Sequence, residues 1–232
     1  AFNPADIDGM LLTHAHVDHC GLVPKLVREG FKGTVYATQA TCDLAKIMLP
    51  DSAHIQESDA EMLNRKGQRR GDAPVEPLYG INDALDALKQ FSPVPYDQEL
   101  HLSDNLRVFF RDAGHILGSA ILEVYVKENG KETKLVFSGD LGQPNQPILR
   151  DPTSIHGADF VITESTYGDR LHQLYDKETA LIEIVNETMD RGGNLIIPSF
   201  AVGRTQTLLY YFYRLHCEGR LDPDIPIIID SP

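Results

Sequence analysis

Hydrophobic positions in the first part of the chain alternate between strand-like and helix-like spacing. Residues 7–12 form a short apolar run typical of a buried strand, and residues 34–38 form a second one. Between them, residues 22–27 carry the apolar stripe of a short helix. Residues 41–66 have a polar helical pattern, and Asn82, a favourable N-cap, predicts where the following helix begins. This alternation is typical of an α/β fold.

From residue 106 the pattern changes to that of strands. Three strands are predicted, over residues 106–112, 120–126 and 133–138. Asn129-Gly130 lies between the last two and favours a tight hairpin turn. Another short apolar strand is predicted over residues 159–163.

The last part of the chain returns to strand and helix alternation. Residues 181–188 and 208–215 have helical apolar spacing, and residues 194–198 between them predict a strand. The apolar run at residues 227–230 predicts one more strand. Because this differs from the preceding hairpins, we expect a domain boundary between residues 168 and 176.

Composition and charge restrict the classes of function. The 232 residues are 42% hydrophobic, and a formal net charge of −13 opposes general electrostatic binding of nucleic acid or an anionic membrane. A polyanionic substrate would therefore need a local positive feature. No run of 18 apolar residues and no secretory signal pattern is present, so we expect no membrane span. The three cysteines are widely spaced and fit no disulfide framework, which favours a cytoplasmic location.

A dense group of metal-binding side chains follows the first predicted strand. In Thr13-His14-Ala15-His16-Val17-Asp18-His19, alternation along an extended chain sends His14, His16 and Asp18 to one side. A turn would bring His19 to join them. Imidazole nitrogen and carboxylate oxygen suit Zn²⁺, with Mn²⁺ or Fe²⁺ as alternatives.

Two residues at later strand ends fit the same site. His115 lies between Gly114 and Gly118, and Asp140 lies in a Ser-Gly-Asp sequence. Each alone would more often be a turn residue. Together with the first group they could supply the ligands of two metals and a bridging carboxylate. Ser119 is expected at most to hydrogen-bond near this site.

The order of these motifs resembles the metal-ligand order of the metallo-β-lactamase superfamily. Residues 162–168 and 197–204 are similar to the beginning of the β-CASP insert found in its nucleic-acid-processing branch. Residues 113–119 resemble the RNA-cleaving group of that branch, which includes the endonuclease subunit of the mRNA cleavage and polyadenylation factor. The resemblance implies an αββα sandwich, incomplete at both ends, over residues 1–172. Residues 173–232 would be the start of the β-CASP α/β insert.

The resemblance also implies a role for each candidate residue. One metal would be held by His14, His16 and His115, the second by Asp18 and His19, and both would be bridged by Asp140. Asp18 would also orient the attacking hydroxide. Glu164 matches the acidic motif that pairs in the family with a later histidine acting as general acid. Independently of the family, Arg204 begins a predicted helix, where it could contact phosphate.

The function implied is a metal-dependent ribonuclease that cleaves RNA with a hydroxide activated by two Zn²⁺ ions. Single-stranded RNA is expected over DNA, and a homodimer is compatible with the sequence. Two alternatives are a hydrolase of a small thioester or lactam and a non-catalytic scaffold subunit. Since family motifs are missing at both ends, we expect the chain to be part of a protein about twice as long and to be inactive by itself.

Overall fold

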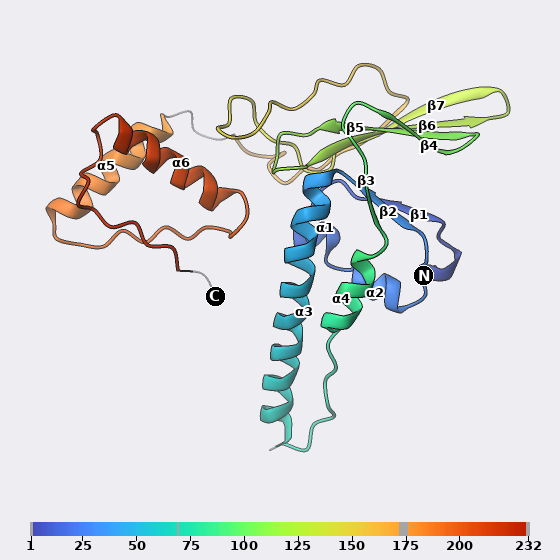
Figure 1. The fold of residues 1–232 in the computed structure, drawn as a ribbon, viewed down its shortest axis with the longest axis horizontal. Coiled ribbons are helices and arrows are strands. Elements are labelled where there is room, and N and C mark those ends of the chain that lie inside the picture. The colour runs from blue at the N-terminus through green and yellow to red at the C-terminus, as the bar shows by residue number, and fades with distance from the viewer. Residues whose placement is uncertain (1, 69, 172–175, 231–232) are drawn as a thin grey trace. The chain divides into compact units, whose positions relative to one another are not determined.

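A computed structural model describes residues 2–68, 70–171 and 176–230 (Figure 1). Contacts divide the chain into two compact units, one ending at Glu164 and the other beginning at Ser165. The domain boundary predicted between residues 172 and 173 lies outside the described residues. No helix of the described residues is long and apolar enough to cross a membrane.

The first unit begins with a parallel sheet connected by helices. The strands are β1 (Gly9–Leu11), β2 (Thr34–Ala37) and β3 (Phe91–Pro93), hydrogen-bonded in the order β1-β2-β3. A 3₁₀ turn (Pro4–Asp6) precedes them, and the helices are α1 (Val17–Cys20), α2 (Val23–Arg28), α3 (Gln39–Gln68) and α4 (Ile81–Leu88). Parallel neighbours require such crossovers, because a tight turn can join only antiparallel strands.

These helices pack on the first sheet through one apolar core. Phe31, Val35, Leu49 and Tyr79 are all almost fully buried in it. The predicted helices over residues 22–27 and 41–66 are confirmed, but Asn82 is not the N-cap of α4. That position is taken by Gly80, whose backbone N–H donates to the Asp83 carboxylate over 2.9 Å.

The second sheet is mostly antiparallel. It contains β4 (Glu99–Ser103), β5 (Leu106–Asp112), β6 (Ala120–Glu128), β7 (Lys131–Phe137) and β8 (Phe160–Ile162), in that order. Within this sheet, as far as the described residues show, only β7 and β8 pair in parallel. Asn129 and Gly130 have φ of 50° and 79°, as a tight hairpin requires, so the predicted hairpin is confirmed.

The two sheets face each other across a second core. Val108, Phe110 and Leu122 of the second sheet pack there with Leu11 and Tyr36 of the first. The helices, the first sheet and the second sheet are thus three layers of the predicted αββα sandwich. Within the described part of residues 1–164, the outer face of the second sheet carries a loop instead of a helix.

That outer face combines apolar and charged contacts. Ile121 and Val136 pack against Ile155 of the loop between β7 and β8. Glu123 is buried on the same sheet and forms ion pairs with Arg111 and Lys134. Burial alone would raise the pKa of Glu123, but the hydrogen bonds from these two cations outweigh it and the pKa is lowered.

The second unit contains two helices, α5 (Lys177–Asp190) and α6 (Arg204–Cys217), in its described part. Val185 and Leu215 are buried between them, which confirms both predicted helices. The strands predicted over residues 194–198 and 227–230 do not form. A strand needs a hydrogen-bonding neighbour, and the described residues of this unit provide none.

Candidate metal centre

The first group of histidines lies where the chain leaves β1 and enters α1. His14 and His16 are in the extended connection, and His16 is the N-cap of α1 with φ −62° and ψ 144°. The helix begins at Val17, and its first turn carries Asp18 and His19. The backbone N–H of His19 donates to the His16 carbonyl over 3.0 Å. This turn brings the His19 side chain back toward the other two imidazoles, with ring centroids of His14 and His19 4.1 Å apart.

His115 and Asp140 come from the second sheet, and glycines allow their loops to approach closely. His115 lies between β5 and β6, and Asp140 follows β7. Gly114 has φ +62°, and a Cβ atom at Gly142 would lie 1.7 Å from the carbonyl oxygen of Gly114. Gly139 has φ +54° and is packed against Thr13, where a Cβ atom would lie 2.8 Å from the threonine Cβ. Side chains at these positions would push the two ligand loops apart.

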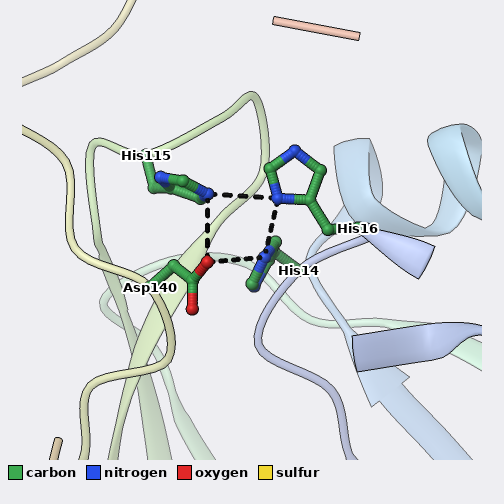
Figure 2. Close-up of side chains that lie close together, drawn as sticks. All are labelled: His14, His16, His115 and Asp140. Atoms are coloured by element: carbon green, nitrogen blue, oxygen red, sulfur yellow. Dashed lines mark hydrogen bonds and ion pairs between the residues drawn. The ribbon is translucent and has the colours of Figure 1, made fainter. Parts of the chain in front are cut away.

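Four donor atoms converge from these two sheets (Figure 2). His16 Nδ1 lies 3.1 Å from both His14 Nε2 and His115 Nε2. Asp140 Oδ2 lies 3.4 Å from His115 Nε2 and 3.8 Å from His14 Nε2. All four donors lie within 4.8 Å of one another. In a tetrahedral site with bonds of about 2.0–2.1 Å, neighbouring donors are about 3.3 Å apart. The four residues therefore fit a bound transition metal.

The histidines of this group are held in the form that binds metal. Burial first, and then neighbouring His19, His16 and His115, together lower the pKa of His14 to about 3. The pKa values of His16 and His115 are also lowered, again mainly by burial. Neutral imidazoles have a free nitrogen lone pair at neutral pH. Thr13 Oγ1 lies 3.2 Å from His14 Nδ1, which leaves Nε2 for a ligand.

His19 and Asp18 continue the cluster on the other side of Asp140. Asp140 Oδ1 lies 3.2 Å from His19 Nε2, while its Oδ2 faces the first group. Asp18 Oδ2 lies 3.6 Å from the same nitrogen of His19, and its side chain is 74% exposed. The two oxygens of Asp140 are therefore directed at different partners, as a bridging carboxylate requires. Asp18 is thus a largely exposed member of the cluster.

The other two predicted site residues are placed differently. Glu164 Oε1 accepts the backbone N–H of Leu141 over 3.1 Å, and the Glu164 N–H donates to Ser138 Oγ over 3.2 Å. Glu164 thus contacts the residues on both sides of the Gly139-Asp140 segment. Arg204 is the first residue of α6, is exposed, and belongs to the second unit.

Three hydroxyl-bearing residues near the site, two of them buried threonines and one a partly buried tyrosine, belong to no motif of the sequence. Thr38, Thr41 and Tyr96 contact the loop that carries His115. Their partners in that loop lie between 23 and 80 residues away in the chain, so no local motif connects them with the histidines.

The chain is similar in sequence to several known proteins. The chain is 40% identical over its whole length to ribonuclease TTHA0252 of Thermus thermophilus, covering 48% of that protein. It is 32% identical to an RNase J-like protein and 32% identical to the transcription termination factor FttA, both of Methanocaldococcus jannaschii. These matches cover 97% and 99% of this chain and 48% and 34% of those proteins. The chain thus spans about half or less of the length of the curated relatives it matches.

The family assignment rests on the larger part of the chain. Residues 1–182 match the metallo-β-lactamase superfamily, and this range includes every residue of the four-donor group. The two facing sheets and the ligand order agree with that match. The chain belongs to the metallo-β-lactamase superfamily.

Proposed function

We propose that the protein containing this chain is a metal-dependent ribonuclease. The observation that carries the proposal is the convergence of His14, His16, His115 and Asp140 at metal-binding distances. The names of the relatives, a ribonuclease and an RNase J-like protein, support RNA as the substrate. The resemblance of residues 162–204 to the β-CASP branch points the same way, with residues 173–232 as the start of its insert.

The donor arrangement supports two cations, of which Zn²⁺ best suits the nitrogen and oxygen donors. His14, His16 and His115 would hold one, His19 and Asp18 the other, and Asp140 would bridge them. Two such cations, when bound, activate water and stabilise the charge that builds on a phosphodiester.

The remaining roles follow from where the side chains lie. Asp18, which is largely exposed, would orient the attacking water. Glu164 fixes the loop of Asp140 through Leu141, and it would pair with the general acid expected from the family. Arg204 would bind a phosphate at the start of α6, where free backbone N–H groups also favour an anion.

The charge of the chain limits how RNA is held. With a net charge of −13, binding must depend on the cations and on local basic residues. We infer that single-stranded RNA is the substrate, because a flexible strand can bend its backbone toward a partly buried donor group. A small thioester or lactam substrate is disfavoured, since the relatives include ribonucleases. A scaffold role is disfavoured by the intact donor set.

A gel assay on labelled single-stranded RNA, single-stranded DNA and a generic ester tests this function. We expect the full-length protein that contains this chain to cleave RNA, and chelation to abolish the cleavage. His16→Ala should remove activity because it removes a donor shared by two short contacts. His54→Ala, which changes an exposed histidine of α3, is the matched control and should cleave normally. Equal cleavage by His16→Ala and the wild type would refute the assignment.

A further inference from the structure

Two threonine hydroxyl groups hold the loop that follows His115. Thr38 Oγ1 donates to the carbonyl oxygen of Gly118 over 2.6 Å, and Thr41 Oγ1 donates to the same oxygen over 2.9 Å. Thr38 Oγ1 also accepts the backbone N–H of Thr41 over 3.3 Å. Gly118 has φ +83°, and a Cβ atom there would lie 2.7 Å from Thr38 Oγ1. The loop is therefore fitted closely against the start of α3.

A tyrosine holds the next peptide group of the same loop. Tyr96 Oη donates to the carbonyl oxygen of Ser119 over 2.8 Å. Burial raises the pKa of Tyr96, so the hydroxyl keeps its proton and remains a donor at neutral pH. We call Thr38, Thr41 and Tyr96 the hydroxyl brace.

Ser119 connects the hydroxyl brace to the histidine. Its Oγ accepts the backbone N–H of His115 over 3.0 Å and that of Ile116 over 3.2 Å. The side chain is fully buried. The backbone position of His115 thus depends on Ser119, whose own carbonyl oxygen is held by Tyr96.

The hydroxyl brace joins the two halves of the candidate metal centre. His14 and His16 follow β1 of the first sheet, whereas His115 follows β5 of the second. Thr38 lies between β2 and α3, and Thr41 lies in the first turn of α3. Both threonines therefore belong, like β1, to the first sheet and its helices. The 3.1 Å distance between His16 Nδ1 and His115 Nε2 therefore depends on how firmly the second-sheet loop is held against the first-sheet elements.

We propose that Thr38, Thr41 and Tyr96 are positioning residues that set His115 relative to His14 and His16 for metal binding. The proposal rests on the proposed metal centre. Removing the threonine hydroxyls would leave the partly buried Gly118 carbonyl oxygen without these donors. The loop would then shift, and His115 would move with it. Residues that support metal ligands in this way typically change metal affinity about 10- to 100-fold when altered.

The test is titration of metal-free protein with Co²⁺, followed by the visible absorption of the bound ion. Valine keeps the shape of threonine without its hydroxyl, so the double variant Thr38→Val, Thr41→Val should bind Co²⁺ about 10- to 100-fold more weakly. The absorption spectrum should also change, because His115 no longer meets the ion at the same distance. The double variant Thr38→Ser, Thr41→Ser keeps both hydroxyls and should restore affinity and spectrum.

A second pair of variants separates positioning from general stability. Tyr96→Phe should weaken Co²⁺ binding, whereas Tyr79→Phe should not. Tyr79 is also fully buried, but it packs in the core between the first sheet and its helices and bonds Ser52 of α3 over 2.9 Å. Circular dichroism establishes whether each variant is folded. If the double valine variant does not fold, the comparison of Tyr96→Phe with Tyr79→Phe tests the proposal instead.

Three results would overturn the proposal: wild-type affinity in the valine pair, no rescue by the serine pair, or equal weakening by Tyr96→Phe and Tyr79→Phe. Absence of Co²⁺ binding by the wild type would instead overturn the metal centre itself, together with the brace.

Discussion

Acid should destabilise the metal-free protein through His14, a fully buried histidine. Its pKa is lowered to about 3 in the folded state, first by burial and then by His19, His16 and His115, from a value of 6.5 in an unfolded chain. Between these two pH values the unfolded state binds a proton that the folded state does not. Stability from this group is therefore complete above pH 6.5 and falls steadily as the pH falls toward about 3.

The magnitude follows from the width of that window. Each pH unit below 6.5 costs about 1.4 kcal/mol for one such group, so lowering the pH from 7.5 to 5 should cost about 2 kcal/mol through His14 alone. Carboxylate groups titrate mainly below pH 5. The interval from pH 7.5 to 5 thus isolates the histidines.

Urea unfolding in the presence of a chelator measures this loss. His14→Gln should lose about 2 kcal/mol less than the wild type over the same interval, because glutamine does not titrate. His101→Gln alters a histidine whose side chain is 68% exposed and is the matched control. Should His14→Gln fail to fold, the His14 ring resonance in nuclear magnetic resonance spectra of the wild type should not titrate down to pH 4. An equal acid sensitivity of His14→Gln and the wild type, or a ring that titrates near pH 6.5, would refute the reasoning.

Three further predictions concern other parts of the chain. Glu123→Ala should destabilise the fold by about 1–3 kcal/mol in urea unfolding, because it removes the hydrogen bonds that the partly buried Arg111 and Lys134 donate to a buried carboxylate; Glu132→Ala, in a more exposed pair, should cost less than about 1 kcal/mol. Gly142→Ala should lower both metal content and melting temperature, since its Cβ would lie 1.7 Å from the carbonyl oxygen of Gly114; unchanged metal content would contradict the close-approach argument. Arg204→Ala should weaken RNA binding, measured by fluorescence anisotropy, more than it slows cleavage at saturating RNA. Unchanged affinity would show that Arg204 does not bind RNA.

Local patterns were sufficient for the elements that depend on local interactions. The strand predicted over residues 106–112 has the same bounds as β5, and the hairpin at Asn129-Gly130 forms because both residues accept positive φ. The helix start at Asn82 was wrong by two residues, because Asp83 caps Gly80 through a contact that a single-residue preference does not reveal. Residues 194–198 show the converse limit: apolar spacing predicts a strand only where a neighbour can pair with it.

The candidate site was predictable where its donors share a short motif. His14, His16 and His19 lie within six residues, and the alternation of an extended chain followed by a turn is enough to group them. His115 and Asp140 were predicted to join them because each follows a strand end, but local patterns do not show that the two sheets face each other, which their approach requires. No sequence motif indicated the hydroxyl brace. Thr38 and Thr41 are 80 and 77 residues away from Gly118 in the sequence, and only the folded chain brings them into contact with it.

Elemental analysis of the full-length protein that contains this chain tests the central claim most directly. The arrangement of donors around Asp140 predicts two transition-metal ions per chain in the wild type, with loss of the ions and of RNA cleavage together on chelation. His16→Ala should retain fewer ions than His54→Ala, measured on the same preparation. A wild-type protein that contains no metal and still cleaves RNA would contradict the claim.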